Sequence, residues 1–336
     1  MKAKGTNMSI PPVVVASARM GWAWQWKQLM NGLAPADQAG NYQRPPSQHQ
    51  QASVPQAKEL ATRSAQWRPR LIIGRSCPWA HRTWLMHQLR GLEGSLSVLV
   101  AKADHNAGRW QLSPPWLGCD SLLALYRRCG NPPEHRATVP ALVDPGSDAQ
   151  TKPRLLGNES AQLVEVLNHW PAAAGAPDLA PAKLKDELNH WQMLLQTAVN
   201  DGVYRCGFAR SQQAYEQACS ELFDALSQVE ESLAKQGPWL CGDQLTIADV
   251  RLFPTLIRWE MVYSPLFGCS REPLWSLPNL WRWRQRFLAL PGVAETCDGR
   301  AWREDYFGAL FPLHPSGIVP AGPDLSKLVN AMPAEF

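Results

Sequence analysis

The chain has 336 residues, of which 45% are hydrophobic and 18% charged, the balance of a globular protein long enough for two domains. The formal net charge of +4 is small and no block of five or more Lys or Arg residues occurs, which disfavours a nucleic-acid-binding protein. No apolar run reaches the ~18 residues that a membrane-spanning helix needs. We therefore expect a cytoplasmic protein without nucleic-acid or membrane partners.

The cysteines are scattered, with no C-x-x-C pair and no Cys/His spacing typical of a zinc site. A disulfide framework is unusual in a chain of this length, so a reducing compartment is favoured and no metal is expected. The eight cysteines are Cys77, Cys119, Cys129, Cys206, Cys219, Cys241, Cys269 and Cys297.

Residues 1–66 form a poorly periodic N-terminal extension, which we expect to be partly flexible. The segment 38–57 is rich in Gln, Pro, Ser and Ala, a composition that argues against a packed core element. The tryptophan-rich stretch 22–26 is compatible both with packing onto the body and with a flexible arm.

Residues 67–170 predict an α/β domain that begins with a βαβ unit. The apolar run Leu71–Ile73 ends at Gly74 and predicts a buried strand. Pro78 suits the first turn of a helix, which we expect to continue to Leu89. Residues 96–100 predict the second strand.

The rest of this domain predicts a ββα unit. A long loop rich in Trp and Pro is expected around residues 110–116, followed by a short helix over 121–129. Two short strands are expected at 139–143 and 155–156, and the next helix begins at 158–160.

Beyond a linker rich in Ala, Pro and Gly at 171–181, the chain is expected to be all-helical over 182–312. Apolar residues recur there every three or four positions. Thr246 and Asp249 have the spacing of a helix-capping box. The tail, 313–336, is rich in Pro and Gly and should run over the surface.

Cys77 is the residue that points most clearly to chemistry. It stands one position before Pro78, where helix N–H groups and the helix dipole can stabilise a thiolate, and Arg75, His81 and Arg82 would add positive charge. We therefore expect a lowered thiol pKa. Position 80 is Ala where a dithiol motif has its second Cys, so an outside thiol such as glutathione must resolve a mixed disulfide.

Three further residues suit a glutathione site. The Val139–Pro140 bond ahead of a strand is a candidate cis peptide, and it would leave the Val139 backbone available to an extended peptide ligand. At the next helix start, Ser160 and the helix N–H groups suit the γ-glutamyl carboxylate, while Glu159 suits its ammonium group. An ordinary strand-start proline and an ordinary helix cap are the alternatives.

Several motifs, in order from about residue 66 to 323, resemble the Xi class of glutathione transferases, the glutathionyl-hydroquinone reductases. The matching segments are Cys-Pro-Trp-Ala-His-Arg-Thr at 77–83, Leu-Arg-Gly-Leu-Glu at 89–93, Thr-Val-Pro at 138–140, Asn-Glu-Ser at 158–160, Gly-Val-Tyr-Arg-Cys-Gly-Phe-Ala at 202–209, Ala-Asp-Val-Arg-Leu-Phe-Pro-Thr-Leu-Ile-Arg at 248–258 and Gly-Ile-Val-Pro-Ala-Gly-Pro at 317–323.

The resemblance implies a glutathione transferase fold, with a thioredoxin-like N-terminal domain and a helical C-terminal domain, and a homodimer. It implies that Cys77 attacks the sulfur of a glutathionyl-hydroquinone, that hydroquinone leaves, and that a second glutathione, as cosubstrate, resolves the mixed disulfide. Trp110 matches a tryptophan packed beside glutathione. Tyr204 and Tyr306 match tyrosines that line the aromatic substrate pocket and can donate to the phenolic oxygen. An arginine near the glutathione carboxylates is also implied, and the candidates are Arg127, Arg128 and Arg136.

The chain departs from the family pattern mainly on the substrate side. The strand before Cys77 reads Arg-Leu-Ile-Ile-Gly at 70–74, Asp305 stands where a His is expected, and Gln111 and Leu112 replace an apolar aromatic pattern. These changes put the identity of the substrate in question more than glutathione binding. The other candidate functions are a general thiol transferase or dehydroascorbate reductase, a conjugating transferase, and a non-catalytic binding module of the same fold.

Overall fold

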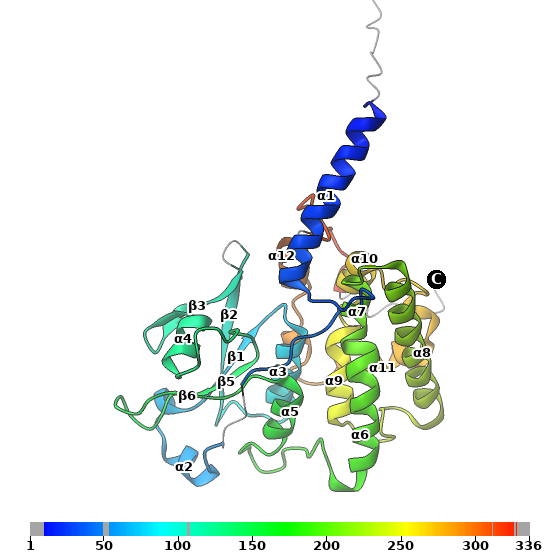
Figure 1. Cartoon of the computed structure of the whole chain (residues 1–336). Coiled ribbons are helices and arrows are strands. Elements are labelled where there is room, and N and C mark those ends of the chain that lie inside the picture. Colours follow the sequence, from blue (N-terminus) through cyan, green and yellow to red (C-terminus); the bar gives the residue numbers. More distant parts are fainter. Residues whose placement is uncertain (1–9, 50–53, 106–107, 311, 326, 328–336) are drawn as a thin grey trace, which may run out of the picture.

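In the computed structural model, which describes residues 10–49, 54–105, 108–310, 312–325 and 327, an α/β domain and a helical domain lie side by side (Figure 1). The α/β domain contains one six-stranded sheet with the strand order β4-β3-β2-β1-β5-β6. Only β1 and β2 are parallel, and every other neighbouring pair is antiparallel. The strands are β1 (Arg70–Gly74), β2 (Ser97–Asp104), β3 (Arg109–Trp116), β4 (Cys119–Ser121), β5 (Ala141–Asp144) and β6 (Arg154–Gly157).

The helix that follows β1 is the link between the two domains. This helix, α3 (Pro78–Leu89), packs against α5 (Ser160–Asn168) of its own domain and against α9 (Ile247–Leu256) of the helical domain. Nine consecutive or near-consecutive residues of α3 are buried, including both of its histidines. The first turn of α3 is therefore packed on two sides, and Cys77 lies at its N-terminal end.

The helical domain confirms the expected all-helical second half. Thr246 donates its N–H to Asp249 Oδ2 at 3.0 Å, so the predicted capping box is present at the start of α9. The helices are α6 (Lys185–Leu194), continued by the π-helical turn η3 (Leu195–Asn200), α7 (Gly202–Gly207), α8 (Gln212–Gln236), α9, the π-helical turn η4 (Trp259–Tyr263), α10 (Ser264–Phe267), α11 (Pro278–Leu288) and α12 (Gly299–Ala309).

Shorter helices complete the chain. In the α/β domain α2 (Ala57–Thr62) and the 3-10 turn η1 (Ala65–Trp67) precede the sheet, and α4 (Leu122–Arg128) follows β4. The helical domain also contains the 3-10 turns η2 (Ala182–Leu184), η5 (Leu274–Ser276) and η6 (Ala294–Thr296).

The loop expected around residues 110–116 is instead strand β3. Its first half pairs with β2 in regular antiparallel register from Arg109 to Leu112. Pro114 and Pro115 lie where the pairing with β4 shifts register, between Gln111 and Trp116. Proline lacks the N–H that a ladder needs, and a register shift is a place where it is tolerated. The two prolines therefore conceal a strand from a sequence-based prediction.

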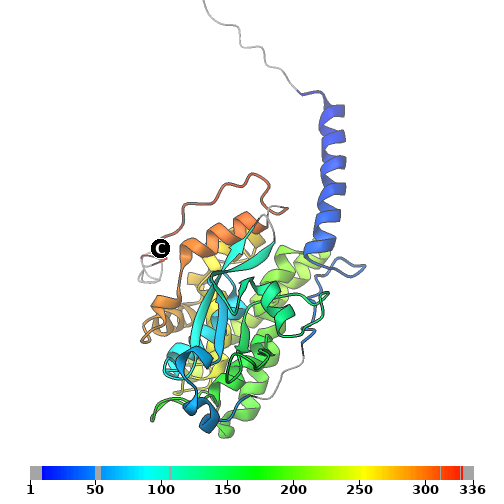
Figure 2. The same ribbon diagram turned by 90° about the vertical axis from the view of Figure 1, so that its left-hand side faces the viewer.

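The N-terminal extension also differs from expectation, because residues 12–33 form a long helix, α1 (Pro12–Leu33). Figures 1 and 2 show that α1 projects away from the body, which it reaches only at its C-terminal end. Residues 34–49 then run as an extended segment back across the body.

Candidate functional site

Cys77 is the N-cap residue of α3, as its position before Pro78 predicts. Its Sγ accepts a hydrogen bond from the Ala80 N–H at 3.5 Å, so it meets the positive end of the helix. On its other side the thiol donates to the Val139 carbonyl oxygen at 3.5 Å. A thiol proton shared with a carbonyl is the neutral form of the group.

A pocket of about 530 Å³ opens above this thiol, a volume in the range of small-molecule sites. All five sequence-predicted glutathione-side residues line it: Cys77, Trp110, Val139, Glu159 and Ser160. The Val139–Pro140 peptide bond is cis, as expected. Residues from four separate segments of the α/β domain thus meet at one place.

The Trp110 ring lies against Gly74, which has no side chain to displace it. A Cβ atom on Gly74 would lie 2.3 Å from Trp110 Cη2. Gly74 ends β1 three residues before Cys77, so the close approach sets the tryptophan ring against the strand that leads to the thiol. Any side chain at position 74 would push the ring away.

Glu159 and Ser160 lie at the start of α5 and have different neighbours. Glu159 caps the helix by accepting from the Ala161 N–H at 3.3 Å. Ser160 is buried, and its Oγ accepts from Arg82 Nη1 at 3.3 Å. Arg82 therefore contacts Ser160 and does not belong to the group of charged residues around the Cys77 thiol. Among the three candidate arginines, Arg136 lines the pocket, whereas Arg127 and Arg128 lie in the last turn of α4.

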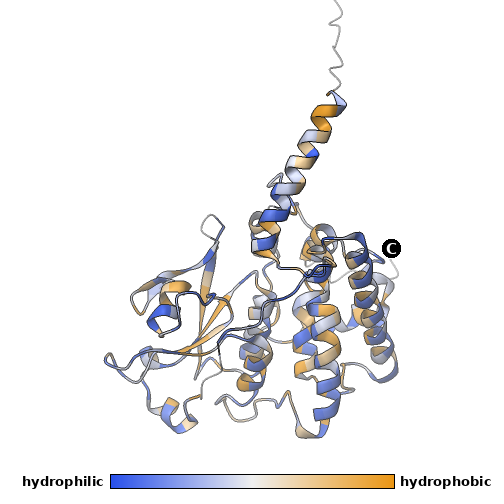
Figure 3. Cartoon of the chain, in the orientation of Figure 1, coloured by the Kyte–Doolittle hydropathy of each residue, from blue (hydrophilic) through white to orange (hydrophobic). Residues whose placement is uncertain are grey.

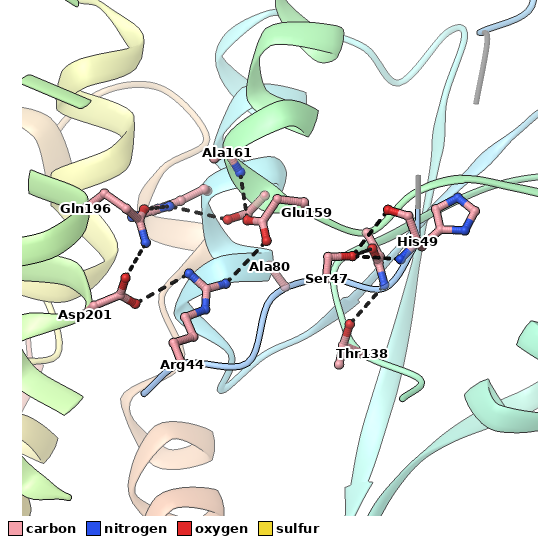
Figure 4. A network of polar contacts seen from close by, with 12 residues as sticks. Arg44, Ser47, His49, Ala80, Thr138, Glu159, Ala161, Gln196 and Asp201 are labelled. Carbon is pink, nitrogen blue, oxygen red and sulfur yellow. Dashed lines mark hydrogen bonds and ion pairs between the residues drawn. The ribbon is translucent and has the colours of Figure 1, made fainter. Parts of the chain in front are cut away.

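The N-terminal segment forms a wall of the pocket that the sequence analysis misses. Six of its residues line the pocket, namely Tyr42, Arg44, Pro45, Pro46, Ser47 and Gln48, and Arg44 contacts the candidate site residue Glu159. Figure 4 shows its guanidinium between Glu159, at 3.6 Å, and Asp201, at 3.4 Å. The same guanidinium lies 3.9 Å from the centroid of the Trp79 ring. Arg44 thus connects both domains with the helix that carries Cys77.

Two more contacts hold this N-terminal segment in place. Ser47 Oγ donates to Asn158 Oδ1 at 2.7 Å, next to Glu159 (Figure 4). His49 Nδ1 lies 3.1 Å from Asn131 Oδ1. A low-complexity composition gave no sign of these contacts, because each is made to a residue more than 80 positions away.

The expected lowering of the Cys77 pKa is not found. Burial raises the pKa of the Cys77 thiol, and this effect outweighs the N–H groups of Ala80 and Trp79 and the positive charges of Arg258 and Arg44. The charges also differ from those expected. Arg75 faces Asp298 at 3.6 Å, and Arg82 contacts Ser160.

His81 contributes no positive charge to the thiol. Burial and the neighbouring Arg258 hold the pKa of His81 well below its usual value, so the ring is neutral. Its Nδ1 lies 2.9 Å from Arg258 Nη1 and its Nε2 lies 2.7 Å from Thr296 Oγ1. An arginine can only donate, so Nδ1 is the acceptor and the ring proton sits on Nε2.

Arg258 is a fully buried cation whose hydrogen bonds go to neutral acceptors. Besides His81, it donates to the carbonyl oxygens of Pro254 at 2.9 Å and Arg75 at 3.2 Å. Trp302 Nε1 donates to the same Arg75 carbonyl at 3.1 Å. The helical domain therefore both anchors the turn before Cys77 and places a positive charge near the thiol.

The two predicted tyrosines are brought together, and a third joins them. The hydroxyls of Tyr204 and Tyr306 lie 2.5 Å apart, and that of Tyr263 lies 3.3 Å from that of Tyr306. Burial raises the pKa values of all three phenols, so each remains a neutral donor. Trp79 stacks on Tyr204 with 6.2 Å between ring centroids, which links the tyrosines to the start of α3. Sequence reasoning missed Tyr263, which carries no local signal.

Asp305, the departure beside Tyr306, has a defined partner. Its Oδ1 lies 2.9 Å from His105 Nε2, at the end of β2. The substrate side of this protein therefore contains a carboxylate–imidazole contact between the two domains. Within the described part of the chain, no group of three His, Cys, Asp or Glu side chains is arranged to hold a metal ion.

Comparisons with known proteins identify the family of the chain. The chain matches the family "Glutathione S-transferase, N-terminal domain" over residues 76–170 and "Glutathione S-transferase, C-terminal domain" over 212–286. It is 36% identical over 262 residues to glutathionyl-hydroquinone reductase PcpF of Sphingobium chlorophenolicum, covering 75% of this chain and 82% of that protein.

Two solved structures are similar in fold. The glutathione-bound structure of YqjG, a glutathione transferase homologue from Escherichia coli K-12, has a TM-score of 0.69 at 33% identity, covering 77% of this chain and 87% of the other. The Xi glutathione S-transferase of Phanerochaete chrysosporium has a TM-score of 0.76 at 29% identity, covering 86% and 94%.

Proposed function

Because this chain belongs to the glutathione S-transferase family, and within it to the Xi class of glutathionyl-hydroquinone reductases, we propose that it removes glutathione from glutathionyl-hydroquinones through Cys77. The observation that carries the proposal is the pocket itself. One cavity is lined by Cys77, by Val139, which precedes the cis Val139–Pro140 bond, and by Glu159 and Ser160 at the start of α5.

The pocket offers each part of glutathione a matching group. Glu159 and Ser160 suit the ammonium and carboxylate of the γ-glutamyl end. The Val139 backbone suits the peptide of the cysteinyl part, which places that sulfur against Cys77 Sγ. Arg136, which also lines the pocket, suits the glycine carboxylate.

The reaction proceeds by thiolate attack on sulfur. The Cys77 thiolate forms an S–S bond with the glutathionyl sulfur, and the bond from that sulfur to the ring carbon breaks. The ring carbon takes up a proton from the neighbouring hydroxyl before this bond breaks, giving the keto form, so the electron pair of the broken bond is delocalised onto the phenolic oxygen, which is protonated as hydroquinone leaves. A second glutathione thiolate then attacks the mixed disulfide, releasing glutathione disulfide and the Cys77 thiol.

The tyrosine cluster stabilises charge on the departing ring. Because Tyr204, Tyr263 and Tyr306 stay protonated, they can donate to the phenolic oxygen while charge develops there.

An assay of three substrates tests the proposal: glutathionyl-benzohydroquinone, dehydroascorbate and an electrophilic aryl halide for conjugation. We expect glutathione-dependent turnover mainly of the first. Preferred turnover of dehydroascorbate would support the general thiol transferase instead. The homodimer that the family resemblance implies stays a prediction.

Replacing Tyr306 by Phe is expected to slow the leaving-group step while glutathione binding stays near normal. Loss of one donor to a developing negative charge lowers kcat by roughly 10- to 100-fold. Steady-state kinetics with glutathionyl-benzohydroquinone measure this, with Tyr215→Phe, whose hydroxyl donates to Gly268 instead, as the control. Unchanged kcat in Tyr306→Phe would remove this residue from the mechanism.

Replacing Arg44 by Met is expected to raise the KM for glutathione about 5- to 10-fold. The guanidinium is partly exposed, so each of its ion pairs is screened, but together they hold Glu159 and Trp79 at the pocket wall. Arg44→Lys keeps the charge and loses the planar contact with Trp79, and should be intermediate. Equal KM values for all three proteins would show that the N-terminal segment does not contribute to binding.

A further inference from the structure

Helix α1 is attached to the body only near its C-terminal end, where Trp26 is partly buried and Met30 is buried. Of its 22 residues, Met30 alone is buried. Arg210 fixes this end by donating to the carbonyl oxygens of Met30 at 2.7 Å and Ala34 at 2.5 Å, and to Asn31. Figures 1 and 2 show the remainder of the helix standing clear of both domains. The helix is therefore held in a defined direction yet covered by nothing in the described chain.

This projecting helix is unusually apolar for an exposed element. Figure 3 shows hydrophobic residues gathered at its tip and along its length. Of the 13 exposed large hydrophobic residues in the described chain, nine belong to it or directly precede it: Ile10, Val13, Val14, Val15, Met20, Trp22, Trp24, Leu29 and Leu33. A concentration of this kind marks an interaction surface.

The apolar residues surround the helix instead of forming one stripe. Successive residues in a helix are about 100° apart, so Val13, Val14 and Val15 point in three directions. Trp22 and Trp24, about 200° apart, point to opposite sides. A partner helix would bury one stripe only and leave the others in water.

The charge of this region has a single sign. Lys2, Lys4, Arg19 and Lys27 are the only charged residues before Asp37, so they account for the whole net charge of +4 and the rest of the chain is neutral on balance. Two of these, Arg19 and Lys27, lie exposed on α1 itself. An occupant of this surface must therefore be apolar and negatively charged at once.

A second copy of the chain does not meet that requirement. The other four exposed large hydrophobic residues are scattered over α6, η5 and the C-terminal tail, so the described body has no apolar face to receive the helix. Pairing α1 with another α1 would bring like charges together.

We propose that α1 is a docking element for an anionic lipid surface. Tryptophan is enriched at the boundary between headgroups and hydrocarbon, where α1 would place Trp22 and Trp24. Arg19 and Lys27 would contact the lipid phosphates. No described helix is long and apolar enough to cross a bilayer. Because its apolar residues lie on every side, α1 would enter the surface layer of the membrane by its tip, where lipid meets all sides of the helix. The absence of a spanning segment does not exclude that mode.

Vesicle co-sedimentation of the full-length protein tests the proposal. We expect binding to vesicles of equimolar phosphatidylcholine and phosphatidylglycerol, loss of binding at high salt, and little binding to phosphatidylcholine alone. The double variant Arg19→Gln/Lys27→Gln should partition roughly 30-fold less, given about a fivefold factor per basic residue. The pair Lys58→Gln/Lys102→Gln, with the same loss of charge on the body, should bind as the wild type does.

A tryptophan pair tests the apolar contribution. Trp22→Ser/Trp24→Ser is expected to lower partitioning at least about tenfold, whereas Trp275→Ser, another exposed tryptophan, should have no effect. Turnover of a water-soluble substrate should be unchanged in all variants. Failure of the wild type to bind anionic vesicles would overturn the proposal. So would a wild-type dimer in sedimentation velocity that becomes monomeric in Trp22→Ser/Trp24→Ser without any vesicle binding, which would assign α1 to a second copy.

Discussion

Cys77→Ser is expected to lose glutathione-dependent reduction of glutathionyl-hydroquinones by a factor on the order of 10³ or more. A serine hydroxyl is not a nucleophile toward sulfur at neutral pH, and no neighbouring thiol can replace it because position 80 is Ala. Parallel assays of wild type and variant measure the loss. The wild type should also be treated with glutathionyl-benzohydroquinone without added glutathione. Intact-protein mass spectrometry should then show one glutathione retained per chain.

The matched control for this substitution is Cys129→Ser. Cys129 is also a partly buried, unoxidised cysteine, but it lies at the end of α4 and burial raises its pKa to about 12. This variant should keep full activity and still retain one glutathione. Full activity in Cys77→Ser would show that the proposed mechanism is wrong.

The sequence predicted the residues on the proposed glutathione side of the pocket because their signals are local. A proline directly after Cys77, following a short apolar strand, is enough to predict a thiol at a helix mouth. An X-Pro bond before a strand marked Val139 as a candidate cis position, and Glu159–Ser160 marked a helix start. Each inference needs only neighbours in the chain, and the pocket lining agrees with all of them.

The features that sequence reasoning missed depend on residues far apart in the chain. Arg44 lines the pocket only because the N-terminal segment folds back onto Glu159, which lies more than 100 residues further along the chain. The hydroxyl of Tyr263 contacts that of Tyr306 where their two helices pack together. Neither the spacing nor the composition of the sequence predicts this contact. The direction of the Cys77 pKa shift is a further case, since the helix terminus was predicted correctly and burial outweighed it.

This balance makes Arg258 the residue whose charge matters most to the thiol. A buried guanidinium without a carboxylate partner is costly, and its three hydrogen bonds here go to neutral acceptors. A Cys77 thiolate would serve as its counter-charge. Arg258 also lowers the pKa values of Tyr263 and Tyr306 against the effect of burial, so the cation acts on both halves of the site. We therefore infer that Arg258 is a positioning and electrostatic residue for thiolate formation.

The pH dependence follows from the sign of the shift. Because burial raises the Cys77 pKa above its ordinary value of 9.0, the thiol is mostly protonated at neutral pH, and both alkylation and turnover should rise with pH through and beyond 9. The raised pKa also favours the folded state while the thiol is protonated, and this contribution is lost as pH rises through the folded-state value. Rates of alkylation and turnover that stay constant between neutral pH and 9 would contradict a raised Cys77 pKa.

Replacing Arg258 by Met should move this pH profile further upward and lower turnover at neutral pH at least about 10-fold. Alkylation of Cys77 across pH, followed by mass spectrometry of its peptide, measures the shift independently of any substrate. Arg258→Lys, which keeps the charge but cannot bridge His81 and the Arg75 carbonyl, should recover part of the profile with weaker anchoring of the turn.

Arg284→Met separates this electrostatic effect from general loss of stability. Both arginines are fully buried, and each guanidinium lies 4.2 Å from the centroid of a tryptophan ring, Trp302 for Arg258 and Trp281 for Arg284. Arg284, however, pairs with Glu260 and does not act on the thiol. Its loss should lower the melting temperature and leave the alkylation profile of Cys77 in place. If Arg258→Met also leaves that profile in place, the positive charge that aids the thiolate comes from the helix terminus and Arg44 alone.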